Sequence, residues 1–431
     1  MSELVQRIRE LAGRKSVKNG LWMYLLQAFN TIIPLLTLPY VTRILGAEGF
    51  GLFSIALNII GYLQVLVEYG FGMSATRKVA VADTDHDLLQ KTFSCVLVAR
   101  LCLMAICVVI SVGYALFSGF MSPQSVCLLI MTCALLGNCV EQSWLFQGLQ
   151  NMKLISIINI VGRTVSTALI FILIKGPDDV YTYSLLYSVS PLIAGFVGLA
   201  VARRTYDLHF VRVTMGEVLG ELRDGFYVFT TQLSAKVFGA AGVTMLGVMA
   251  PASVVGIYSA IQKVPNLIML AWSPVSQVLY PISSKRLDED FGAGVRFVLK
   301  IRRYALIVFG ALCALVALLS RPIVEIGFGA EYADYHYWVI PLLGWLLVGI
   351  NNNFLGIQIL LGSGHDKEYS ACFQVGVVAT LACNAILIAL FGGNGASVAP
   401  LFSELILTIL LTRAVHKLTK TETRGQDNVS S

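Results

Sequence analysis

Charged residues are scarce in this chain. Of its 431 residues only 13% are Asp, Glu, Lys or Arg, whereas 56% are hydrophobic and the mean hydropathy is +0.75. This composition excludes a water-soluble domain and is typical of helices that lie in lipid. The net charge of +6 sits in the segments between the apolar stretches, so it does not indicate nucleic-acid binding. We expect an integral membrane protein with no nucleic-acid partner.

Motifs of enzyme chemistry are also missing. No P-loop, HExxH or GxSxG pattern occurs, and the five histidines are scattered. All nine cysteines fall inside predicted spans, at spacings that fit neither a metal site nor a disulfide framework. The outward loops are short, whereas a membrane glycosyltransferase or polymerase usually needs a large one that carries its catalytic groups. We expect a protein that is not an enzyme, with no catalytic residue, no metal and no cofactor.

What the sequence has in abundance is long apolar stretches, which predict an all-α polytopic membrane protein. Each stretch is long enough to cross a hydrocarbon core that needs about 20 residues. The twelve predicted transmembrane helices cover residues 19–42, 51–72, 92–117, 124–148, 154–174, 181–202, 225–249, 253–281, 303–320, 337–361, 369–391 and 395–415.

Basic residues are distributed unequally between the two sides of these helices. Twenty-four of the 31 lysines and arginines fall in the terminal segments and in every second loop. Only Arg43, Lys175 and Arg321 fall in the loops of the other side. Because an excess of basic residues marks the cytoplasmic side, both termini are predicted to be cytoplasmic, which requires an even number of spans.

The chain resembles itself at an offset of 205 residues. Residues 18–27 align with 223–232, and Gly51–Ser54 (GLFS) aligns with Gly256–Ser259 (GIYS) in the same register. This repeat predicts two parallel lobes of six helices, with a substrate site near the midplane between them. The expected division is an amphipathic cytoplasmic N-terminus (1–18), an N-terminal lobe (19–203), a cytoplasmic linker (204–224), a C-terminal lobe (225–416) and a cytoplasmic tail (417–431). The tail is polar from Thr419 to Ser431, and this part is expected to be disordered.

Seven ionisable residues lie within the predicted spans. They are Glu68, Arg100, Glu141, Arg163, Lys236, Lys263 and Glu404. Each is costly at a lipid-facing position, so most must face protein or a water-filled cavity. Arg163, Lys236 and Lys263 lie about ten residues into their helices, which is roughly 15 Å and therefore near the midplane.

These charges have two interpretations. Lys236 and Lys263 have no obvious carboxylate at their depth, which indicates an anionic ligand. The alternative is that the seven charges form buried ion pairs that fix the packing of the helices. On this view Arg163 pairs with Glu141, and the carboxylates of Glu68 and Glu141 pair with Arg100 or Arg77.

Polar residues and prolines in the spans fit a cavity that moves. Candidate polar lining residues are Gln27, Asn30 and Thr31, which precede Pro34 and Pro39 in the first span, and Gln232 in the seventh. The eighth span contains Pro265, Pro274 and Pro281. Proline kinks a membrane helix because it removes a backbone hydrogen bond.

Five motifs carry a resemblance to a known family. They are Leu38–Gly46 (LPYVTRILG), Gly49–Ser54 (GFGLFS), Ser74–Ala80 (SATRKVA), Trp144–Lys153 (WLFQGLQNMK) and Gly256–Val264 (GIYSAIQKV). As a set they resemble the polysaccharide transporters of the multidrug/oligosaccharidyl-lipid/polysaccharide (MOP) exporter superfamily, in particular the O-antigen (Wzx-type) flippases. The chain departs from that pattern at Gln262, where relatives more often have Glu, so Lys263 lacks an acidic neighbour.

The resemblance implies a multi-pass flippase of a bacterial inner membrane. Its substrate would be an O-antigen repeat-unit oligosaccharide on undecaprenyl diphosphate, moved from the cytoplasmic to the periplasmic leaflet by alternating access. The lipid-linked oligosaccharide, membrane lipids, an O-antigen polymerase and a chain-length regulator are the implied partners. The implied diphosphate site is a cationic cavity of Lys236, Lys263, Arg163, Arg43 and Arg77.

Three other functions are weighed against this one. A drug or metabolite antiporter of the same superfamily would favour an acidic cavity, whereas the midplane charges here are mainly basic. A major-facilitator transporter would carry a Gly-x-x-x-Asp-Arg-x-Gly-Arg-type loop, which Gly72–Asp87 does not provide. A membrane glycosyltransferase or polymerase is disfavoured by the short outward loops.

Overall fold

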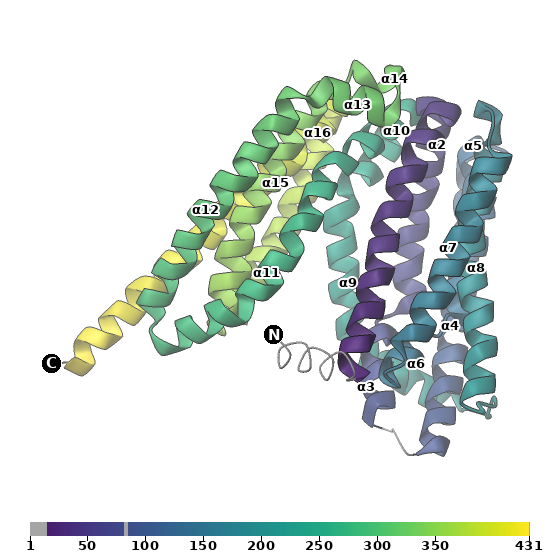
Figure 1. Ribbon diagram of the computed structural model, residues 1–431, viewed down its shortest axis with the longest axis horizontal. Coiled ribbons are helices and arrows are strands. Elements are labelled where there is room, and N and C mark those ends of the chain that lie inside the picture. Colours follow the sequence, from purple (N-terminus) through teal and green to yellow (C-terminus); the bar gives the residue numbers. More distant parts are fainter. Residues whose placement is uncertain (1–14, 82–84, 431) are drawn as a thin grey trace, which may run out of the picture. The chain divides into compact units, whose positions relative to one another are not determined.

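The protein is built from helices. The computed structural model describes residues 15–81 and 85–430, and no strand occurs within these ranges (Figure 1). The described residues contain ten helices that are long and apolar enough to cross a membrane. The all-α prediction is therefore confirmed for this part of the chain. The N-terminal segment 1–18 lies almost entirely outside it.

By its internal contacts the chain divides into two units, Met1–Lys236 and Val237–Ser431. The division falls inside a helix, twelve or more residues beyond the linker expected at 204–224. The first part of the seventh predicted span thus packs with the first unit. The prediction of twelve spans in two six-helix lobes with boundaries at 203 and 225 stays a prediction.

The first unit contains long and short helices that pack closely on one another. In chain order they are α2 (Lys15–Glu68), α3 (Phe71–Val81), α4 (His86–Ser118), α5 (Pro123–Val140), α6 (Ser143–Gly148), α7 (Met152–Leu173), the 3-10 turn η1 (Pro177–Asp179), α8 (Val180–Thr205) and the first part of α9 (Met215–Met249). The α5 helix packs on α2, α4 and α8. Glycine permits the closest of these approaches, because a Cβ at Gly195 of α8 would overlap the backbone of Gly137 in α5.

Helices of the second unit include several that are interrupted. They are α10 (Ala252–Ile261), α11 (Lys263–Glu289), α12 (Phe291–Leu318), α13 (Ser320–Phe328), α14 (Ala330–Ala333), the 3-10 turn η2 (His336–Trp338), α15 (Val339–Asn353), the π-helical segment η3 (Phe354–Leu361) and α16 (Asp366–Ser430). The span predicted over 253–281 lies within one helical stretch of membrane-spanning length, Ala252–Glu289, which is interrupted at Gln262 between α10 and α11. Pro265 explains the break, since it lacks the N–H that would bond the Ile261 carbonyl.

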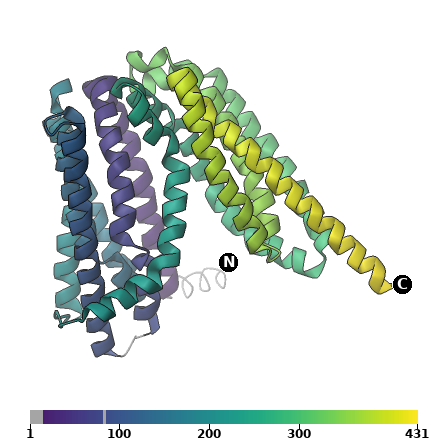
Figure 2. The same ribbon diagram turned by 180° about the vertical axis from the view of Figure 1, so that it is seen from behind.

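The two longest helices each contain a glycine with non-helical backbone. Gly46 in α2 has φ 66° and Gly392 in α16 has φ 55°, values that residues other than glycine rarely adopt. Predicted spans end and begin on either side of each glycine, so both positions agree with the expected breaks near 43–50 and 391–395. Figure 2 shows the arms of α16 on either side of Gly392 in yellow-green and yellow.

The C-terminal tail differs from its prediction. Residues 419–430 were expected to be disordered because they are polar, but α16 continues through Ser430. A helix that is already formed extends without the cost of a new nucleus, so a polar sequence can follow it as helix.

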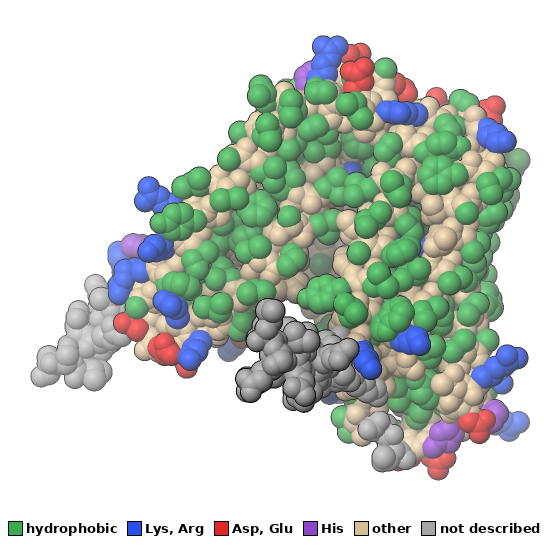
Figure 3. Space-filling model, viewed as in Figure 1, with side chains coloured by type: hydrophobic (Ala, Val, Ile, Leu, Met, Phe, Trp, Pro, Cys, Tyr) green, Lys and Arg blue, Asp and Glu red, His purple; other side chains and the backbone are tan. Residues whose placement is uncertain are grey.

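The surface of each unit matches its expected environment. Hydrophobic side chains cover the middle of the helices, and the charged side chains gather toward their ends (Figure 3). Large apolar residues such as Phe117, Val248 and Leu318 are more than 80% exposed. A contiguous apolar surface of this extent is typical of contact with lipid.

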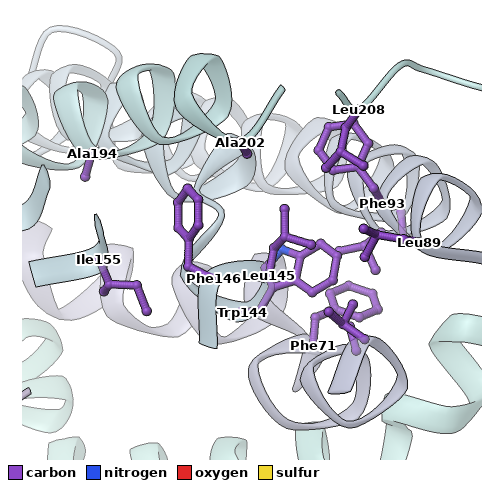
Figure 4. Packing of buried hydrophobic residues seen from close by; sticks show 14 of the residues in the cluster. Phe71, Leu89, Phe93, Trp144, Leu145, Phe146, Ile155, Ala194, Ala202 and Leu208 are labelled. Carbon is purple, nitrogen blue, oxygen red and sulfur yellow. The ribbon is translucent and has the colours of Figure 1, made fainter. Parts of the chain in front are cut away.

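An aromatic cluster closes one end of the first unit. Phe71 of α3, Phe93 of α4 and Trp144 of α6 are buried together, and Figure 4 shows the Trp144 ring beside Phe71. The Thr76 hydroxyl donates to the Trp144 carbonyl at 3.0 Å, which joins α3 to α6. The short helices α3 and α6 are thus fixed to the longer ones by buried aromatic surface.

Candidate substrate site

Arg100 of α4 is the most deeply buried cation, with 3% of its surface exposed. Its Nη1 donates to the carbonyls of Glu141 at 2.7 Å and Asn138 at 3.2 Å, and its guanidinium lies 5.9 Å from the centre of the Phe71 ring. These carbonyls end α5, where no further helical turn supplies a donor. Arg100 therefore stabilises the break between α5 and α6 and has a structural role.

The expected carboxylate partners of Arg100 do not form ion pairs with it. The Glu68 carboxylate accepts a hydrogen bond from Gln64 Nε2 at 2.7 Å, and the Glu141 carboxylate accepts one from the Ser143 hydroxyl. Among the described residues, no cation lies within 4 Å of either carboxylate. The structural interpretation of Arg100 is supported: its hydrogen-bond partners are backbone carbonyls, and the two carboxylates act on it only from beyond ion-pair distance. Backbone carbonyls at a helix end were the better candidates, and the sequence does not reveal where α5 ends.

Arg163 lies on α7 and its side chain is half-buried. Within residues 15–81 and 85–430 its guanidinium has no hydrogen-bond or ion-pair partner. The proposed pair with Glu141 is therefore not formed in this structure. Arg163 is thus a basic residue in a predicted membrane span with no ion-pair partner among the described residues.

Lys236 lies on α9 and is half-buried. Its Nζ is 5.5 Å from the centre of the Tyr62 ring of α2, a distance that allows a cation–π interaction. It also lies directly against Gly61, where an added Cβ would overlap the ammonium. Sequence reasoning identified Lys236 but missed both neighbours, because their contact joins helices far apart in the chain.

Lys263 is the first residue of α11, immediately after the break at Gln262. Its side chain is accessible, and no described residue makes a hydrogen bond or ion pair with it. Because the adjoining residue is Gln262, that position supplies no countercharge. Lys236 belongs to the first unit and Lys263 to the second.

The two arginines proposed nearer the ends of the spans are both exposed. Arg43 lies in α2, three residues before Gly46, and Arg77 lies in α3. The adjacent Lys78 differs, because it forms ion pairs with Glu221 at 2.8 Å and with Asp224 at 2.7 Å. Arg77 is thus available on the surface, whereas Lys78 is bound to the beginning of α9.

The proposed polar lining residues have mixed surroundings. Gln27 is exposed, and its backbone carbonyl accepts a hydrogen bond from Thr31 at 3.0 Å. The side-chain oxygens of Asn30 and Gln232 are buried, and neither has a hydrogen-bond partner among the described residues. These two oxygens have unused capacity to accept hydrogen bonds from water or a ligand hydroxyl.

The ionic contacts at the start of α9 were not predicted from the sequence. Besides the pairs of Lys78, Lys91 of α4 contacts Glu217 at 2.5 Å. The Phe229 ring stacks on Tyr69 with their centres 4.5 Å apart. The acidic residues within the basic linker were the available signal. Together these contacts fix the first turns of α9 to α3 and α4.

A buried carboxylate lies in the second unit. Glu404 of α16 is 6% exposed and accepts a hydrogen bond from Asn352 Nδ2 at 2.5 Å. Asn352 Oδ1 in turn accepts one from Thr408 at 2.7 Å. No lysine, arginine or histidine in the described part of the chain pairs with Glu404. The amide therefore takes the place of the countercharge expected for a buried ion pair.

The geometry can now be compared with known proteins. The model of a family described as "Polysaccharide biosynthesis protein" matches residues 16–286, which is more than half of the chain. The chain belongs to this polysaccharide biosynthesis family. It is similar over 91% of its length to a putative O-antigen transporter of Escherichia coli K12, with 28% identity and 95% of that protein covered.

The chain is also similar in fold to solved structures of other proteins. The lipid II flippase MurJ in an inward closed conformation has a TM-score of 0.66, with 13% identity, 93% of this chain covered and 87% of that one. An inward-facing multidrug resistance MATE transporter of the MOP superfamily has a TM-score of 0.64, with 14% identity, 92% of this chain covered and 99% of that one. The polysaccharide biosynthesis protein therefore shares the fold of MOP-superfamily transporters.

Proposed function

We propose that this family member is a flippase for a lipid-linked oligosaccharide and not an enzyme. Its family, its similarity to a putative O-antigen transporter and its likeness in fold to a lipid II flippase support this function. The apolar surface of each unit is suited to a substrate whose lipid stays in the bilayer while its sugar crosses in a wet cavity.

The more specific proposal names the substrate and the direction. The protein moves an O-antigen repeat unit on undecaprenyl diphosphate from the cytoplasmic to the periplasmic leaflet of a bacterial inner membrane. Both termini lie in the cytoplasm, and transport proceeds by alternating access. An O-antigen polymerase and a chain-length regulator are the proposed protein partners.

The observation that carries the proposal is that some cations in the predicted spans form no ion pair with another described residue. Arg163 and Lys263 lie in predicted spans and have no ion-pair partner among the described residues. A lone charge in a membrane span is costly, which makes it a candidate for function. A diphosphate carries about two negative charges and is bound by lysine and arginine. We assign Lys263 and Arg163 to the diphosphate site on this ground, and Lys236, Arg43 and Arg77 as the other members of the proposed cationic cavity.

Substitution of the two lysines tests the assignment. Lys236→Ala and Lys263→Ala should each abolish O-antigen display while the protein remains in the membrane at its normal level. Lys→Arg at the same positions should restore part of the display, because charge matters more than shape. Normal display in both single variants and in the double variant would exclude these lysines. Loss of the protein itself would instead indicate that they are packing residues.

Reporter fusions test the orientation independently. A fusion after Lys285 should report the cytoplasm and a fusion after Pro177 the periplasm, because basic residues mark the cytoplasmic loops. If the two fusions report the same side, the arrangement of spans is wrong.

A further inference from the structure

The inference concerns the surroundings of the Lys236 ammonium in the first unit. Two consecutive residues of α2 lie against it: Gly61, which supplies no side chain, and Tyr62, whose ring centre is 5.5 Å from Nζ. Gly61 and Tyr62 lie in the part of α2 that follows Gly46, and Lys236 lies inside α9. We call Gly61 and Tyr62 the lysine seat.

The depth of the seat follows from two separate counts along the chain. Gly61 is about ten residues into the span predicted over 51–72, and Lys236 is about eleven into the span over 225–249, so each lies roughly 15 Å from an end. The structure brings these residues into contact, which agrees with both counts. The seat therefore holds the ammonium near the middle of the membrane.

Gly61 provides the space for the ammonium. A Cβ built at this glycine would overlap Lys236 Nζ and would lie 2.8 Å from its Cε. The atoms that collide are the flexible end of a lysine side chain, so alanine at this position would displace the ammonium and leave the helices in place. Alanine is also a better helix former than glycine, so the fold should tolerate the change.

Tyr62 attracts the ammonium without cancelling its charge. The face of an aromatic ring is electrostatically negative but carries no net charge, unlike a carboxylate. The contact therefore lowers the cost of a cation in a membrane span and brings no negative charge to it.

We propose that Gly61 and Tyr62 are positioning residues, which hold the Lys236 ammonium where it meets the anionic group of the transported lipid. This inference rests on the proposed function, in which Lys236 contacts a diphosphate. The seat acts through the lysine and does not itself touch the substrate. It determines where the charge lies, and thus which depth in the cavity an anionic group can occupy.

The first experiment measures the lysine directly, without transport. The full-length protein in nanodiscs of phosphatidylethanolamine and phosphatidylglycerol is treated with formaldehyde and cyanoborohydride. The rate of Lys236 methylation is then read by mass spectrometry relative to Lys153. Gly61→Ala and Tyr62→Leu should each raise this ratio about threefold or more, because the attraction of the ring for the ammonium is lost.

Two variants serve as controls. Tyr62→Phe keeps the ring, so its ratio should stay within about twofold of the unmodified protein. Gly113→Ala in α4 introduces the same change at a glycine with no atom within 4 Å of the added Cβ, and its ratio should not change. Equal Lys236 rates in the unmodified protein, Gly61→Ala and Tyr62→Leu would overturn the lysine seat. If Gly61→Ala does not reach the membrane, Tyr62→Leu against Tyr62→Phe still decides.

The second experiment separates the seat from the function on which it rests. Undecaprenyl diphosphate in the nanodiscs should slow Lys236 methylation in the unmodified protein, and Gly61→Ala and Tyr62→Leu should lower O-antigen display about fivefold at normal protein level. If both variants change the methylation rate but undecaprenyl diphosphate gives no protection and display stays normal, the lysine seat stands and the diphosphate assignment of Lys236 fails.

Discussion

Two intramembrane cations of the first unit, Arg100 and Lys236, have opposite surroundings. Arg100 is enclosed at a helix end and donates to two backbone carbonyls, whereas Lys236 is half-buried and rests against a glycine and an aromatic ring. Arg100 Nη1 thus donates to carbonyls at the end of a helix, whereas the ring beside Lys236 adds no negative charge. The comparison teaches that a charge in a membrane span indicates function only when the protein does not already use it.

The largest expected effect comes from removing the structural cation. Arg100→Leu should leave the carbonyls that end α5 without their donor, at a cost of about 3 kcal/mol in the free energy of unfolding. We expect less protein in the membrane and a lower Tm of the purified protein in a thermal-shift measurement. Normal stability combined with lost transport would place Arg100 with Lys236 and remove the distinction.

Arg163 should follow Lys236 and not Arg100. Arg163→Ala should lower O-antigen display about tenfold, which corresponds to about 1.4 kcal/mol, with little change in Tm because no hydrogen bond or ion pair of the described residues is lost. Arg163→Lys should keep part of the activity. The charge-reversed pair Arg163→Glu with Glu141→Arg should not restore transport, and restoration would show that the two residues pair after all.

The smallest effect is expected at the ion pairs that join α3 to α9. Lys78→Ala should lower the free energy of unfolding by about 0.5–1 kcal/mol, because the Lys78 side chain is 34% exposed and water screens its pairs. The loss should shrink further in high salt. Arg77→Ala, next to it but without such a pair, should leave Tm unchanged. A salt-independent loss at Lys78 would group it with Arg100.

Much of the fold could be predicted from the sequence because span formation is local. The breaks near Gly46 and Gly392 and the interruption of the eighth span by Pro265 follow from the backbone preferences of glycine and proline. The tail was the exception, since helix extension beyond Lys417 depends on the helix before it and not on its own polarity.

The candidate site was only partly predictable. Lys236, Lys263 and Arg163 could be identified as residues near the midplane, because the hydropathy of the sequence gives the ends of each span and their depth is counted from those ends. Partners were harder to assign, since they depend on how each helix is rotated about its axis. For Arg100 the sequence suggested carboxylate partners, whereas the structure shows hydrogen bonds to carbonyls at the C-terminal end of α5. The contact of Lys236 with Gly61 and Tyr62 was not predicted.

The sequence by itself determined that this protein lies in a membrane, that its spans are helical and which of its side chains are charged within them. These properties are sums over about twenty neighbouring residues, so they need no knowledge of the fold. Only the tertiary structure decided which of those charges are used in packing. That choice rests on single contacts between distant helices, such as Arg100 with the end of α5 and Lys236 with Gly61, which no local sum contains.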